Sequence, residues 1–73
     1  MQERRRAILQ ELEEYGKVKV AQLSEELNCS EVTIRNDINT INLFLEKNSF
    51  AIIDMDRYGF CSCSVELSKM KDL

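Results

Sequence analysis

The sequence contains no histidine and no proline, and only two of its 73 residues are glycine. Without histidine, the chain lacks the commonest general base and the commonest metal ligand. Without proline and with so little glycine, it contains no flexible linker and no low-complexity tract. A chain of this length forms one domain with a thin core, which leaves little room for a deep substrate pocket. These absences argue against an enzyme, and we expect no cofactor.

Long hydrophobic runs are also missing, and the N-terminus lacks the apolar core of a signal peptide. The three cysteines are an odd number, which fits a reducing compartment better than a disulfide framework. We therefore expect a cytoplasmic protein with no membrane partner. Cys61 and Cys63, taken with Cys29, do not have the spacing of a zinc site. Buried thiols are the favoured interpretation, and a metal or redox site is the alternative.

Hydrophobic periodicity predicts three helices, at residues 2–15, 21–27 and about 31–45. Tyr15 continues the apolar spacing of the first helix, and Gly16 is a stop signal. Asn28 tolerates a positive φ and can close the second helix, while Ser30 is a good N-cap for the third. One narrow stripe of the third helix is apolar, and it consists of Ile34, Ile38, Ile41 and Leu45. So short a connection between the second and third helices indicates a helix-turn-helix unit.

Strand-like patterns lie on both sides of these helices. Residues 17–20 alternate with period two and predict a very short strand. Residues 50–55 and 60–65 predict two longer strands, joined by a turn at residues 56–59. The sequence therefore predicts an α+β, mainly α fold: a winged helix-turn-helix with three helices, a short strand and a C-terminal β-hairpin wing. We expect this domain to cover residues 1–65, with residues 66–73 as a tail or linker.

The face of the third helix opposite the isoleucines is polar in an unusual way. It carries Val32, Asn36, Asn39, Thr40 and Leu43, with Thr33 and Arg35 at its flanks. A helix face that is merely solvated more often carries Glu and Lys. Asn pairs well with adenine and Arg with guanine, and Val or a Thr methyl group contacts the thymine methyl in a major groove. The group therefore predicts DNA recognition, and poor helix formers on a wet surface are the alternative.

Contacts to the DNA backbone are expected from other positions. Ser30, Thr33 and the helix N-terminus suit phosphate oxygens. Arg4 and Arg5 belong to the basic run at residues 4–6, which either grips the backbone or is an ordinary solvated helix start. Arg57, near the wing tip, reaches a neighbouring minor groove in this interpretation, although two aspartates beside it weaken the claim.

The net charge of −3 argues against DNA binding, because most of the affinity for DNA comes from cationic groups that release counterions from phosphates. The distribution of the charge along the chain weakens this argument. Residues 1–10 carry three Arg and one Glu, a balance of +2, whereas residues 11–28 carry two Lys and five Glu, a balance of −3. The acidic charge is thus concentrated on the first two helices, while the rest of the chain is near neutral, and we expect weak, salt-sensitive binding.

Residues 18–38, VKVAQLSEELNCSEVTIRNDI, resemble the winged-helix core of two bacterial families. One is the DeoR-type sugar repressors, and the other is the activators with phosphotransferase-system regulation domains, of the mannitol- and lichenan-operon kind. The stretch Ser-x-x-Thr-Ile-Arg-x-Asp is the most specific part, and the resemblance covers about residues 3–65. Asn36 stands where the DeoR type usually has Arg, and the basic His-Gly-Gly wing of that type is missing. The closing Tyr58-Gly59-Phe60 is more similar to the activators.

This resemblance implies that the third helix contacts DNA through Ser30, Thr33, Arg35 and Asn36. It implies a structural role for Asp37, paired locally with the backbone or an Arg. It also implies a regulator of carbohydrate uptake or metabolism that binds double-stranded DNA as a homodimer. Phosphotransferase-system proteins would then be partners, through domains beyond residue 73. The competing hypothesis is a winged helix used for protein–protein interaction, which the acidic balance suits.

Overall fold

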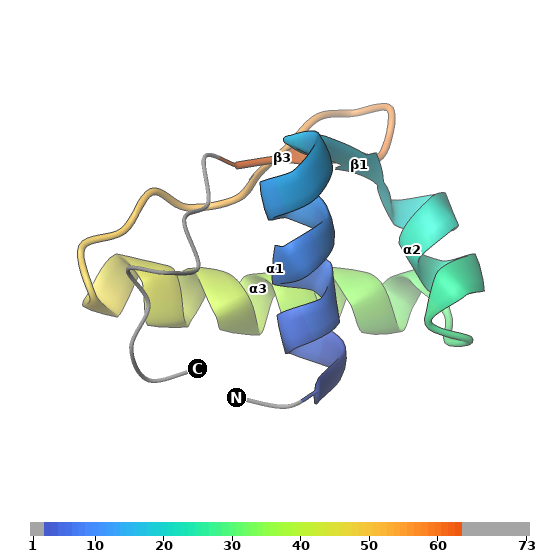
Figure 1. Cartoon of the computed structure of the whole chain (residues 1–73), viewed down its shortest axis with the longest axis horizontal. Helices are drawn as coiled ribbons and strands as arrows, with labels where there is room; N and C mark the ends of the chain where they lie inside the picture. Colours follow the sequence, from blue (N-terminus) through green and yellow to red (C-terminus); the bar gives the residue numbers. More distant parts are fainter. Residues whose placement is uncertain (1–2, 64–73) are drawn as a thin grey trace.

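The computed structural model describes residues 3–63 and shows three helices with a small three-stranded sheet. The helices are α1 (Glu3–Tyr15), α2 (Val20–Glu26) and α3 (Glu31–Lys47). The strands are β1 (Lys17–Lys19), β2 (Asp54–Met55) and β3 (Phe60–Ser62). Figure 1 shows α1 crossing α3, with the sheet at the end of α1 far from this crossing. The arrangement is the predicted winged helix-turn-helix fold.

The predicted helix boundaries agree with the structure to within two residues. Ser30 caps α3, because its Oγ accepts a hydrogen bond from the Thr33 N–H at 3.1 Å. Gly16 and Asn28 both have positive φ, of 75° and 56°, as their places at helix ends predicted. Only residues 27–30 separate α2 from α3, so the chain bends sharply there. α2 begins one residue earlier than expected and α3 continues two residues further, to Lys47.

The core lies between the three helices and the inner face of the sheet. The predicted stripe of α3 is fully buried, together with apolar side chains from α1, β1, α2, β3 and the segment before β2: Ile8, Leu9, Leu12, Val18, Val20, Leu23, Ile53 and Cys61. Tyr15, which was expected on the apolar face of the first helix, is instead 62% exposed. It is the last residue of α1, at the end of the helix that lies far from α3 (Figure 1). None of the helices within residues 3–63 is long and apolar enough to cross a membrane.

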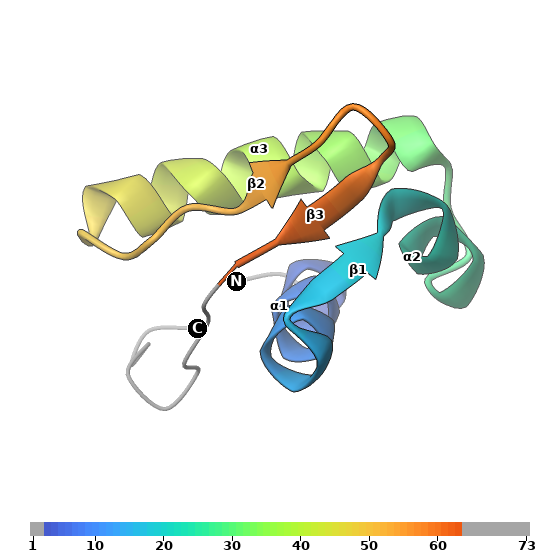
Figure 2. The ribbon, with the colours of Figure 1, turned by 90° about the horizontal axis from the view of Figure 1, so that it is seen from above.

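β3 is the central strand of an antiparallel sheet with the order β1-β3-β2. Figure 2 shows this order, with β2 next to α3 and β1 on the side of α1. Ser62 of β3 lies opposite Lys17 on one side and Asp54 on the other. The predicted hairpin is therefore confirmed as the β2–β3 pair. The pairing of β1 with β3 was not predicted, because it joins segments more than forty residues apart.

The first hairpin strand was predicted too long, and the second ends at Ser62, one residue before the last described residue. Within the predicted first strand, residues 50–53 are not a strand, because their backbone groups bond to α3 and to side chains. The Phe50 N–H donates to the Leu45 carbonyl at 2.8 Å. The Asn42 amide bonds to both backbone groups of Ile53, accepting from its N–H at 2.7 Å and donating to its carbonyl at 3.1 Å. At the other strand, residues 64 and 65, like the expected tail at 66–73, lie outside the described residues.

Replacing Asn42 with Ala is expected to lower the free energy of unfolding by about 1–3 kcal/mol, because both backbone groups of the buried Ile53 lose their partner. Urea or thermal unfolding measures this change, and hydrogen exchange at the Ile53 amide localises it. Asn39→Ala, at an exposed position of the same helix, is the control for the better helix propensity of alanine. Equal stabilities of the two variants would contradict the role given to Asn42.

Candidate nucleic-acid interface

The face of α3 opposite the core is open to solvent. Its exposed residues are Val32, Arg35, Asn36, Asn39, Thr40 and Leu43, as the sequence predicted. The Arg35 side chain is 50% exposed, and its Nη2 lies 4.0 Å from the Glu31 carboxylate one turn earlier. An exposed pair at this distance is weak. Arg35 and Asn36 are therefore available to a partner that approaches α3 from outside.

The first turn of α3 brings two hydroxyl groups together. Ser30 Oγ and Thr33 Oγ1 are 2.9 Å apart, next to the free N–H groups at the start of the helix. Hydroxyl and N–H groups in this position suit an anion such as a phosphate. Thr40 lies two turns further on, and its hydroxyl donates to the Asn36 carbonyl at 3.1 Å. Thr40 therefore presents its methyl group and oxygen lone pairs rather than a free donor.

Arg4 and Arg5 are not an ordinary solvated helix start, which was one of the two interpretations of the basic run. Arg4 donates from Nε to Asp37 Oδ2 and from Nη2 to Asp37 Oδ1, the second bond at 3.1 Å. The Arg5 Nε donates to the same Oδ1 at 3.3 Å. Asp37 is 3% exposed, so α1 and α3 are joined by an ion pair behind the exposed face. The resemblance implied a local partner for Asp37, either the backbone or an Arg, whereas the two arginines that pair with it lie on α1, 32 and 33 residues away.

Asp37 is charged in this setting in spite of its burial. The hydrogen bond from Arg4 lowers the pKa of the Asp37 carboxyl and outweighs the opposing effect of desolvation, with a smaller contribution from Arg5. The same bond raises the pKa of the Arg4 guanidinium. Two arginines and one carboxylate leave a net charge of +1 at the start of α1. Any grip on a phosphate there depends on the Nη groups that do not face Asp37.

The sheet contributes a basic and aromatic cluster that the sequence reasoning missed. Lys17 and Lys19 of β1 both lie over the ring of Phe60, with Nζ at 4.8 Å and 5.7 Å from the ring centroid. At the wing turn, the Arg57 guanidinium lies over the Tyr58 ring at 5.2 Å. Period two had placed both lysines on one strand face, but their position beside Phe60 depends on the unpredicted β1–β3 pairing.

The wing turn itself is held from two sides. The Asp56 carboxylate accepts from the N–H groups of Tyr58 and Phe60, at 2.9 Å and 3.0 Å. The Val20 N–H donates to the Gly59 carbonyl at 2.8 Å, which ties the turn to the start of α2. Asp56, one of the acidic residues that argued against a wing contact, is therefore engaged in closing the turn. Its charge nevertheless stays close to Arg57.

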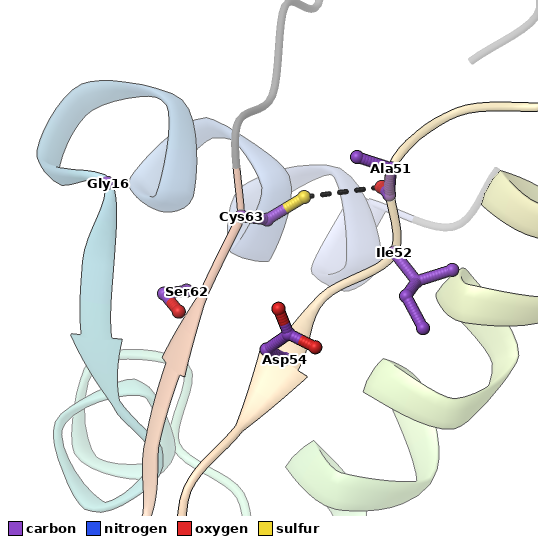
Figure 3. Close-up of a pocket in the computed structure, with 6 residues that line it drawn as sticks. All are labelled: Gly16, Ala51, Ile52, Asp54, Ser62 and Cys63. Carbon is purple, nitrogen blue, oxygen red and sulfur yellow. Dashed lines mark hydrogen bonds between the residues drawn. The ribbon is translucent and has the colours of Figure 1, made fainter.

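The three cysteines are buried or half-buried, and two of them bond to backbone carbonyl groups. Cys61 is buried and donates to the Val18 carbonyl at 3.2 Å, whereas Cys29 and Cys63 are half-buried. Figure 3 shows Cys63 directed toward the Ala51 carbonyl, at 3.3 Å, beside an open hollow of about 330 Å³ at the edge of the sheet. Burial raises the pKa of the Cys61 and Cys63 thiols. Across residues 3–63, no group of three or more His, Cys, Asp and Glu is placed to hold a metal ion.

A group of acidic residues lies where α1 meets the end of α2, and it consists of Glu11, Glu14 and Glu26. A hydrogen bond shared with Glu26 raises the pKa of Glu11 from 4.5 to about 7, with desolvation and the charges of Glu26 and Glu14 acting in the same direction. The same bond lowers the pKa of Glu26. Near neutral pH this pair holds up to one proton, so the acidic group carries less charge than the sequence count indicates.

A family model described as an HTH domain matches residues 4–60. This range includes the three helices, apart from the first residue of α1, and the wing turn. Comparison with curated proteins and with solved structures gives no match.

Glu11→Gln is expected to raise the free energy of unfolding at pH 8 by about 0.5 kcal/mol, because it removes the repulsion between the Glu11 and Glu26 carboxylates. The gain is small because this pair is at least partly exposed to solvent. Because the pKa of Glu11 is higher in the folded chain than in the unfolded chain, its protonation stabilises the fold fully below pH 4.5. This contribution is lost as the pH rises through about 7. Glu26 acts in the opposite direction, but only below its ordinary value of 4.5. Thermal unfolding at pH 5 and pH 8 tests the difference. Glu25→Gln, the same change at an exposed site of α2, should keep the wild-type pH dependence.

Proposed function

Because this chain belongs to the helix-turn-helix domain family, we propose that it binds double-stranded DNA sequence-specifically, as part of a bacterial transcription regulator. Helix-turn-helix domains are typically DNA-binding and non-catalytic. The observation that carries the proposal is the exposure of Arg35 and Asn36 on α3, directly after a sharp turn and opposite a fully buried stripe.

The N-terminal half of α3 is the proposed recognition surface. A helix of 17 residues is about 25 Å long, and its first two turns reach the bases when it lies in a major groove. Arg35 can bond to a guanine edge and Asn36 to an adenine edge. Val32, which is exposed on the first turn, suits contact with a thymine methyl group, and so does the methyl of Thr40.

Backbone contacts are proposed on both sides of this helix. Ser30 and Thr33 face one phosphate together with the N-terminal N–H groups of α3. Arg4 and Arg5 use their remaining Nη groups, since their Nε groups are bonded to Asp37. The wing turn and α3 lie toward the same side of the molecule in Figure 2 but are well separated in Figure 1, so a further contact from Arg57 is proposed at a neighbouring groove.

The resemblance described above supports a wider biological setting. We propose a cytoplasmic regulator of carbohydrate uptake or metabolism that binds paired half-sites as a homodimer. In the activator type, phosphotransferase-system proteins act through further domains. The departures from the DeoR pattern at Asn36 and at the wing favour the activator type.

A protein-binding winged helix is the competing function, and its support is the net charge of −3. Such a module would more often expose a contiguous apolar patch. On α3 the exposed Val32 and Leu43 are separated by Asn36 and Asn39. The polar residues between them favour DNA. Mobility shifts with duplex DNA at low and moderate salt distinguish the two functions.

Arg35→Ala and Asn36→Ala are each expected to weaken binding to a preferred duplex by about 1–3 kcal/mol and binding to an unrelated duplex by much less, since each side chain is proposed to make one base contact. The preferred duplex is selected from a random-sequence library with the wild-type chain, and fluorescence anisotropy measures binding. Both variants should keep the melting temperature, because the side chains are exposed.

Lys47→Ala, which removes one positive charge from the last turn of α3, is the control for charge alone. It should weaken binding to both duplexes alike. Undiminished affinity of both recognition-helix variants for the selected duplex would refute the placement of α3 in the groove.

A further inference from the structure

We propose that Asp37 is a specificity-determining positioning residue, which sets the ratio of specific to non-specific DNA binding without touching DNA. Its side chain is buried behind the exposed face of α3 and bonded to Arg4 and Arg5 of α1. This inference rests on the proposed function, and it adds a residue that lies outside the recognition surface.

The first part of the argument concerns the rotation of α3 about its axis. The buried stripe of α3 packs through apolar contacts, which are not directional and tolerate small rotations. Hydrogen bonds weaken steeply when their angle changes. Three N–H groups of α1 converge on the Asp37 carboxylate, so this carboxylate must point at α1. Arg35 and Asn36 directly precede it in the helix, and the rotation that turns Asp37 inward turns both of them outward.

Stability alone is a poor explanation for this ion pair. The desolvation of a buried carboxylate offsets much of its attraction to its partners, so such pairs contribute little net stability. The three directional bonds instead favour one rotation of α3 about its axis over slightly different rotations. Because base recognition requires side-chain placement to within a hydrogen-bond length, this orientation decides whether Arg35 and Asn36 meet their bases.

The second part concerns the charge of α1. Non-specific affinity grows with the number of cationic groups that meet phosphates. Asp37 reduces the charge of the Arg4 and Arg5 pair from +2 to +1, and it holds their side chains at only 38% and 26% exposure. The carboxylate therefore restrains the part of the surface that would otherwise bind any sequence. Asp37 thus raises the ratio of specific to non-specific binding in two ways, through the orientation of α3 and through the reduced charge of α1.

Asp37→Asn tests the proposal in the 73-residue chain. The probes are the duplex selected by the wild-type chain and a scrambled duplex of the same composition, each titrated at several salt concentrations. The variant should bind the selected duplex more weakly and the scrambled duplex more tightly, so that their affinity ratio falls about tenfold or more. Its salt dependence on the scrambled duplex should steepen by up to about one unit of log–log slope.

Two further variants separate positioning from charge. Arg4→Gln removes two of the three bonds to Asp37 together with a positive charge, so the ratio should fall while affinity for the scrambled duplex also falls. Glu46→Gln removes an exposed negative charge from the same helix. It should raise both affinities alike and leave the ratio unchanged.

Circular dichroism establishes that each variant is folded at the temperature of the titration. A folded Asp37→Asn that keeps the wild-type ratio, or that loses affinity for both duplexes equally, overturns the proposal. Should Asp37→Asn fail to fold, the ratio of Arg4→Gln decides in the same way. A wild-type chain that selects no preferred duplex refutes the proposed function itself, and the inference falls with it.

Discussion

The bonds from Arg4 and Arg5 to the Asp37 carboxylate join the first turn of α1 to the middle of α3, across more than thirty residues of sequence. Without a paired partner, a buried carboxylate would be too costly to keep inside the fold. The crossing of the two helices is therefore held at one defined point by directional bonds. Around it the apolar stripe of α3 closes the core. Its opposite face is left to solvent as a consequence of the same orientation.

Local chemistry made most of the helical architecture predictable. The cap at Ser30 depends only on a hydroxyl and an N–H three residues later. The positive φ values of Gly16 and Asn28 follow from the residue types at the helix ends. The buried and exposed faces of α3 follow from a period of 3.6 residues. Each of these signals lies within a few residues of sequence, and each is confirmed by the structure.

What the sequence did not reveal depends on contacts between distant segments. The pairing of Asp37 with α1 arises from the crossing of two helices, and no local period encodes it. The pairing of β1 with β3 likewise brings Lys17 and Lys19 to Phe60. The overlong first strand of the predicted hairpin has the same origin, since the Asn42 side chain takes the Ile53 backbone bonds that a strand partner would have made. The proton shared near Glu11 also requires two separate helices to meet.

The separation of α3 into a buried face and an exposed face bears on how readily such a domain acquires a new target sequence. Substitutions at exposed positions such as Val32, Asn36 and Asn39 remove no core contact, and surface changes of this kind alter stability by about 0.5 kcal/mol or less. The Asp37 ion pair and the isoleucines are untouched by them. New base preferences can therefore accumulate on the outer surface while the framework that orients it is inherited unchanged.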